Sequence, residues 1–161
     1  KHLAHRCPRF PRIIASMGGR GLLRLLLGGC GLHAARGGCP GSIDVVGHGE
    51  VSLVTAKWDK GSVKAGKSEL SGGRLITPRK RSRTYFASTC SEGKYNHTQY
   101  AALKLLGKTL RYTVDLSGAG CGCNAAIYLT SMQQNKNPSD CEDYYCDANK
   151  VCGVSCGEFD L

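Results

Sequence analysis

The chain has 161 residues, a length that suits one domain, and a formal net charge of +10. The charge is uneven: lysines and arginines number six against no acids in residues 1–35, ten against four in 36–89, and six against eight in 90–161. A nucleic-acid-binding domain is expected to carry its basic surplus on its ordered surface, whereas this surplus belongs to the first half. We therefore expect no nucleic-acid partner.

Cysteine usage indicates the redox environment of the chain. Seven of the ten cysteines lie between Cys90 and Cys156, and no Cys-x2-Cys pair typical of zinc sites occurs there. Disulfides formed in an oxidising compartment are therefore expected, with no metal or cofactor. An odd number in this block requires a partner elsewhere, such as Cys39 or a cysteine beyond Leu161.

The first 35 residues have the pattern of a leader. Residues 1–16 show no periodicity that would pack, so we expect them to be unstructured upstream sequence. From Met17, a basic residue, a short apolar run and the small pair Ala34-Ala35 predict a secretory signal peptide over residues 17–35. The run is too short to span a membrane. A disordered basic arm is the alternative.

Residues 36–83 are rich in Gly, Ser, Lys and Arg, a composition that predicts no particular fold apart from strand-like pieces such as Val51–Val54. The basic run from Arg79 to Arg83 fits either a nuclear-localisation or nucleic-acid patch or a solvated loop. The cysteine-dense block that follows does not suit a reducing compartment, which favours the loop.

Strand patterns dominate after residue 84, and no helical period of useful length appears. A short strand is predicted at 84–88, a strictly alternating one at 109–116, and a third at 121–132. On the third, Asn124 and Tyr128 share a face, which suits either a sugar-binding surface or a core aromatic beside a turn residue. The prediction is an all-β fold, a sandwich or barrel of antiparallel strands.

Two short motifs in this half carry chemistry. Asn96-His97-Thr98 matches the acceptor pattern for N-glycosylation, whereas Asn137-Pro138-Ser139 is excluded by its proline. At the end of the chain, Glu158 and Asp160 would share one face of a strand, with Phe159 and Leu161 on the other. Such a carboxylate pair suits retaining glycoside hydrolysis, although a solvated strand face would give the same pattern.

Three segments, in the same order, resemble glycoside hydrolase family 7 cellulases. They are Cys121–Met132, similar to the family's Cys-Gly-x-Asn-Gly-Ala-Leu-Tyr-Phe-Val-Ser-Met strand, Tyr145-Cys146-Asp147, and Ser155–Leu161, similar to the start of its catalytic segment. The resemblance covers residues 84–161 and implies the N-terminal part of a concanavalin-like jelly-roll catalytic domain. The loop from Gln133 to Cys152 is shorter than in fungal members, so an open groove and a covered tunnel both remain possible.

The resemblance also implies roles for individual residues. Glu158 would be the nucleophile, and Asp160 would tune it through a shared proton. The glucan-binding cleft would be lined by Asn124, Tyr128, Tyr145 and Asp147. The acid/base glutamate would stand at position 163, past Leu161, so we expect a fragment that is inactive by itself.

These observations together predict a secreted, monomeric, retaining β-1,4-glucanase that hydrolyses cellulose. We expect no association with a membrane once its signal is removed. Its partner would be a polysaccharide, and no nucleic acid. A β-1,3-glucanase of the same clan and a secreted carbohydrate-binding module without catalysis are the alternatives. A nucleic-acid-binding protein would instead need the Arg79 to Arg83 run in its mature form.

Overall fold

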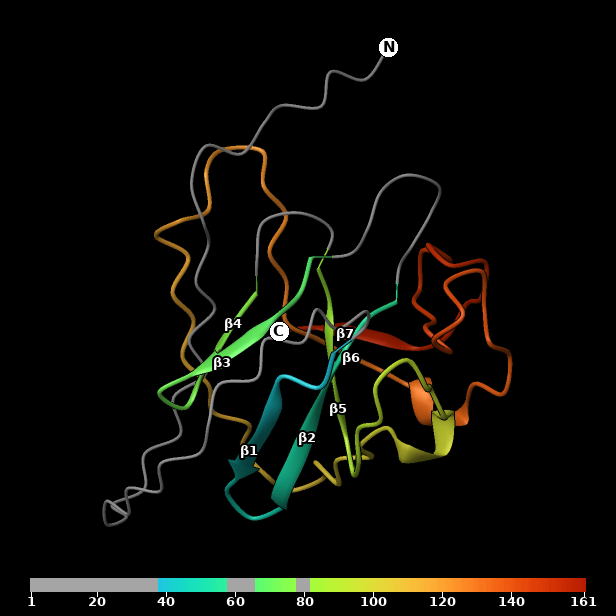
Figure 1. The fold of residues 1–161 in the computed structure, drawn as a ribbon, viewed down its shortest axis with the longest axis horizontal. Coiled ribbons are helices and arrows are strands. Elements are labelled where there is room, and N and C mark those ends of the chain that lie inside the picture. Colours follow the sequence, from blue (N-terminus) through green and yellow to red (C-terminus); the bar gives the residue numbers. More distant parts are fainter. Residues whose placement is uncertain (1–37, 58–65, 78–81) are drawn as a thin grey trace.

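A computed structural model describes residues 38–57, 66–77 and 82–161 (Figure 1). The leader, the predicted signal peptide and the basic residues 79–81 lie outside the described residues. Among the described residues there is no helix of the length and apolar character that a membrane crossing requires.

The largest sheet has three antiparallel strands, in the order β1 (Gly41–Val45), β2 (Gly49–Thr55) and β5 (Thr84–Ala87). β2 is the central strand, and it buries Val51, Leu53 and Val54 because its β-branched and aliphatic residues suit a pleated surface. Much of this sheet comes from the Gly/Ser-rich segment, whose strand-like piece at residues 51–54 is confirmed as part of β2. The strand predicted at 84–88 is confirmed as β5.

Two smaller sheets are also antiparallel. β3 (Glu69–Ser71) and β4 (Arg74–Ile76) form a hairpin through Gly72-Gly73, whose φ angles of 56° and 71° are those of the tight turn that matches strand twist. β6 (Tyr128–Thr130) pairs with β7 (Glu158–Asp160). Two 3-10 helices, η1 (His97–Gln99) and η2 (Met132–Gln134), contact each other. The described residues contain no α-helix, so the predicted all-β class is confirmed.

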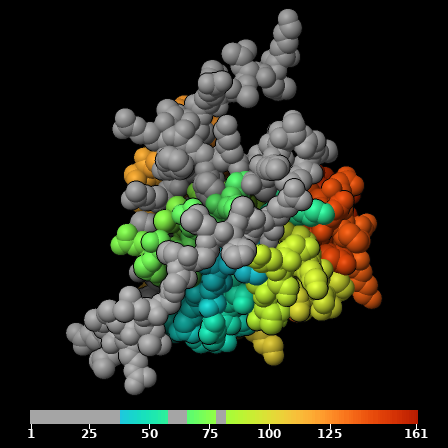
Figure 2. Space-filling view, viewed as in Figure 1, coloured from blue at the N-terminus to red at the C-terminus, as the bar shows by residue number. Residues whose placement is uncertain are grey.

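The main core gathers residues from β2 and β5 with the disulfide-rich segment near the C-terminal end, residues 139–156. Its buried members are Val54, Ala56, Tyr85, Ala87, Tyr100, Met132, Cys141, Tyr145, Cys146 and Cys152. In the space-filling view, the surface around residues 85–100 lies between β1–β2 and this segment (Figure 2). The core therefore joins the first sheet to the region that precedes β7.

Disulfides link these parts as the cysteine count suggested. Cys39 pairs with Cys90, which confirms Cys39 as the partner of the odd-numbered block. Two further bonds, Cys141–Cys152 and Cys146–Cys156, close short loops within the disulfide-rich segment. Among the described residues Cys121 is free and exposed.

Two predicted strands differ from the structure. The strand expected at 109–116 is wrong: only Asp115 takes part in a β-bridge, and the chain from 101 to 127 runs out from the sheet and back (Figure 1). The strand expected at 121–132 is reduced to β6. Burial does alternate from Leu110 to Val114 as the pattern predicted. Alternation decides which side chains are shielded, but a strand also needs a neighbour that bonds its backbone. In the described part of the chain β7 pairs with β6, whereas residues 109–114 take part in no β-bridge.

Candidate active site

The candidate site is built on the β6–β7 ladder. Tyr128 lies opposite Asp160 and Thr130 opposite Glu158, while Leu129 lies opposite Phe159. Residues directly opposite each other in an antiparallel pair share a face, so the two carboxylates lie on the face of Tyr128 and Thr130. The other face carries Leu129 and Phe159, of which Phe159 is 65% exposed.

Glu158 is held by a backbone amide from the disulfide-rich segment. Its Oε2 atom accepts a hydrogen bond of 2.7 Å from the N–H of Ala148. Glu158 is half-buried and Asp160 is exposed. A hydrogen bond to a carboxylate is charge-assisted and stronger than a neutral one, so it fixes the position of this oxygen. A shallow depression beside it is lined by Leu129, Thr130, Ser131, Gly157, Glu158 and Phe159.

Ala148 owes its position to Asp147, whose side chain is almost fully buried. One oxygen of Asp147 accepts from the backbone N–H of Val151 at 2.9 Å, which closes the turn that contains Ala148. The backbone of Asp147 bonds to both Val154 and Cys156. The turn is thereby tied to the strand segment that leads into Glu158.

A chain of hydroxyl groups joins this turn to β6. The Tyr145 hydroxyl donates to the second oxygen of Asp147 at 2.8 Å, and the hydroxyls of Tyr145 and Tyr128 lie 3.0 Å apart. Burial, followed by the hydrogen bond with Tyr128, raises the pKa of Tyr145, so its hydroxyl keeps its proton and remains a donor. Tyr128, Tyr145 and Asp147 thus form one connected group beside the acid-bearing strand.

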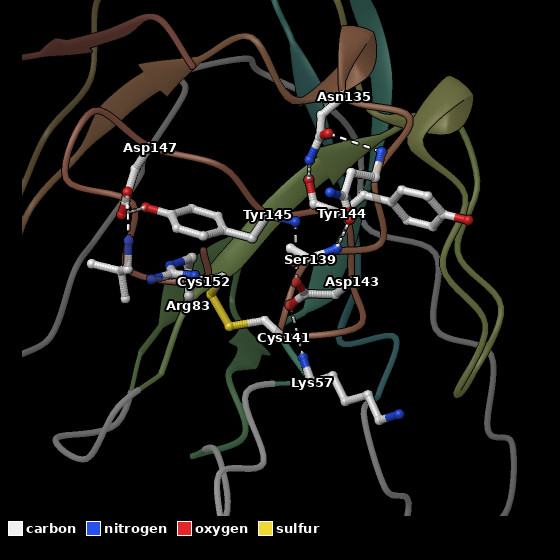
Figure 3. Close-up of a disulfide and its surroundings, with 12 residues drawn as sticks. Lys57, Arg83, Asn135, Ser139, Cys141, Asp143, Tyr144, Tyr145, Asp147 and Cys152 are labelled. Carbon is white, nitrogen blue, oxygen red and sulfur yellow. Dashed lines mark hydrogen bonds between the residues drawn. A yellow bond between two sulfur atoms is a disulfide. The ribbon is translucent and has the colours of Figure 1, made fainter. Parts of the chain in front are cut away.

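Arg83 packs against the Tyr145 member of this group (Figure 3). Its guanidinium lies over the Tyr145 ring, 3.3 Å from the centroid, where the electron-rich face attracts a cation. It also donates to the Tyr85 hydroxyl at 3.4 Å. The basic run predicted as a solvated loop therefore ends in a half-buried arginine that packs against an aromatic ring.

Asp143 is the second buried acid of the segment. Its carboxylate accepts from the Tyr85 hydroxyl at 2.8 Å and from the backbone N–H groups of Lys57 and Tyr145, both at 3.2 Å. Its carbonyl accepts from Tyr100. Burial raises the pKa of Asp143, while these hydrogen bonds oppose the rise. Asp143 therefore attaches the disulfide-rich segment to the first sheet.

The same segment contains unusual backbone conformations. Four residues other than glycine have positive φ angles between 55° and 64°: Ser139, Glu142, Tyr144 and Lys150. Each such residue costs about 1–2 kcal/mol because its Cβ crowds the following carbonyl oxygen. Such strain persists where the surroundings fix the chain, and it clusters at functional sites. Here two disulfides and two buried aspartates supply the restraint.

Five of the six predicted site residues are brought together: Tyr128, Tyr145, Asp147, Glu158 and Asp160. Asn124 is exposed, lies before β6 and takes no part in the hydrogen-bond chain. The sequence reasoning missed Arg83, Asp143 and the Ala148 N–H. Asp143 could have been suspected because it stands within the Cys141 to Cys146 interval, whereas nothing local distinguishes Arg83 from its basic neighbours.

Comparison with known proteins gives this antiparallel, disulfide-linked chain its class. The family model of glycosyl hydrolase family 7 matches residues 74–156, just over half of the chain. Searches of the curated proteins and of the solved structures found no match. The chain belongs to glycosyl hydrolase family 7, a family of cellulase-type glycoside hydrolases with a β-jelly-roll fold. The match begins ten residues before the boundary expected at 84 and takes in β4 and β5.

Proposed function

We propose that this protein is a secreted β-1,4-glucanase that cleaves cellulose with retention of anomeric configuration. One observation carries the proposal: the segment that matches the family leads directly into β7, and its Ala148 N–H bonds the Glu158 carboxylate. The disulfides agree with an oxidising, extracellular setting. A signal peptide at residues 17–35 and a monomeric state complete the proposal.

In the proposed reaction Glu158 is the nucleophile. Its free carboxylate oxygen attacks the anomeric carbon while Oε2 keeps its hydrogen bond to the Ala148 N–H. A glycosyl–enzyme ester forms as the bond to the glycosidic oxygen breaks, and the acid/base carboxyl gives that oxygen a proton as the sugar leaves. Asp160, two residues on along β7, shares a proton with Glu158 and tunes it. Water then hydrolyses the ester, which restores the starting configuration.

The acid/base carboxyl is proposed at position 163. Residues five apart have opposite parity on a regular strand, so a β-bulge after Asp160 is needed to bring both catalytic carboxyls to one face. Retention requires them to be about 5–5.5 Å apart.

The glucan would lie along the acid-bearing face. Tyr128 is the proposed contact from β6, because it lies opposite Asp160 and is only half-buried. Tyr145 and Asp147 are buried, so we propose that they act on the sugar through the Tyr128 hydroxyl. Asn124, which is exposed, would contact a more distant sugar unit.

The test uses the protein expressed from its complete coding sequence, with E158Q compared to E92Q. Glu92 is an exposed turn residue remote in sequence from β7, so it provides a matched loss of one charge. E158Q should lower the release of reducing ends from amorphous cellulose at least about a thousandfold without changing the unfolding midpoint. E92Q should retain wild-type rates, and NMR of the first product should show the β-anomer.

Each alternative has its own outcome. Turnover retained in E158Q would refute Glu158 as the nucleophile, and a first product in the α-configuration would refute retention. Faster cleavage of laminarin than of cellulose would indicate a β-1,3-glucanase. Binding to cellulose with no hydrolysis by the wild type would indicate a carbohydrate-binding module.

A further inference from the structure

We propose that Asn96 carries an N-linked glycan. The residue opens the acceptor tripeptide Asn96-His97-Thr98, which forms the start of η1. The proposal rests on secretion, which is part of the proposed function, because N-glycosylation occurs in the secretory pathway.

The local geometry presents both chemical groups of the tripeptide to solvent. Asn96 and Thr98 are exposed. The Asn96 Oδ1 atom accepts from the backbone N–H of Thr98 at 3.0 Å and from its hydroxyl at 2.8 Å. The amide nitrogen Nδ2, which is the atom to be glycosylated, takes part in neither bond. These contacts span two residues and form an Asx turn, so they do not depend on the rest of the fold.

The residues around the tripeptide are anchored inward. The Tyr95 hydroxyl donates to the carbonyl of Thr55 at 3.0 Å, and Tyr100 is buried in the core. The His97 ring bonds the carbonyl of Gln133 at 2.8 Å. Exposed and shielded residues therefore alternate, and a glycan on Asn96 would extend into solvent without displacing a core side chain.

The glycan donor in this transfer is an oligosaccharide linked to a lipid through pyrophosphate. The Asn96 Nδ2 attacks the anomeric carbon of the first sugar, so a C–N bond forms while the C–O bond to pyrophosphate breaks. The lipid pyrophosphate leaves with the electron pair, and one amide proton passes to a base of the transferring enzyme. The Oδ1 hydrogen bonds to Thr98 polarise the amide.

Asn137 provides a control within the same chain. It is exposed, and its Oδ1 atom accepts from the backbone N–H of Ser139 at 2.9 Å, an Asx turn like that of Asn96. Pro138 separates the two residues, and a proline in this position excludes glycosylation. The two asparagines share exposure and turn type and differ in the acceptor pattern.

The experiment expresses the complete coding sequence in a eukaryotic secretory host and treats the product with peptide-N-glycosidase. In the wild type, N137Q and E158Q, the peptide that contains residue 96 should lose the mass of one glycan, and mapping should find Asp in place of Asn96 after release. In N96Q and T98A the corresponding peptide should show no mass shift. P138A, which creates an acceptor at Asn137, should add a glycan to the peptide that contains residue 137.

A secreted wild-type protein without a glycan, from a host that glycosylates P138A, would overturn the proposal and leave the hydrolase proposal intact. Protein retained in the cytosol would overturn both the glycan and secretion. A secreted wild-type protein that carries the glycan but does not hydrolyse cellulose would refute the proposed function alone.

Discussion

Asp147 provides the most direct test of how the disulfide-rich segment is held. In D147A the buried Tyr145 hydroxyl and the part-buried Val151 N–H both lose a charged acceptor. A hydrogen bond to a charged group contributes about 1.5–3 kcal/mol, so the loss of both should lower the free energy of unfolding by about 3–6 kcal/mol. In D147N one oxygen still accepts from Val151 and the amide donates to Tyr145, so the loss should be about 1 kcal/mol.

The assay is urea unfolding of the complete protein with its disulfides intact, followed by circular dichroism. Asp140 belongs to the same segment but is exposed, and D140A should change the free energy of unfolding by no more than about 0.5 kcal/mol. D147A with a loss below about 1 kcal/mol would refute the reasoning, because it would mean that the two donors find other partners at no cost.

Two further predictions concern stability. Because burial raises the folded-state pKa of Asp143 above its usual 3.8, its contribution is present below pH 3.8 and lost as the pH rises through the folded pKa. Wild type should therefore lose stability relative to D143N as the pH increases above about 3.8, and a difference independent of pH in paired urea titrations would contradict this. The Cys39–Cys90 bond joins residues 51 apart, so the free energy of unfolding of C39A/C90A, measured by thermal unfolding, should be about 4 kcal/mol lower than that of the wild type. C121S removes a free, exposed cysteine and should melt like wild type; a double variant as stable as C121S would contradict the argument.

Local patterns predicted those features that depend on near neighbours. The short strand at 84–88 and the acid alternation of β7 were predicted from local pattern, and the odd cysteine count pointed to Cys39. The strand at 109–116 failed because alternation says nothing about which strand lies alongside. The partners of Asp143 could not be assigned even where the residue itself could be suspected, since its bonds with Tyr85 and Lys57 join residues 58 and 86 positions apart.

These long-range contacts explain why a strained segment precedes the candidate nucleophile. Four left-handed residues together cost several kcal/mol, which a solvated loop would avoid by relaxing. Two disulfides, Asp143 and Asp147 prevent that relaxation. The restraint positions the Ala148 N–H 2.7 Å from Glu158, and a fixed donor needs no reorganisation when charge changes on the carboxylate. A rigid segment with one backbone amide directed at β7 is therefore what we expect of a scaffold for a nucleophilic carboxylate.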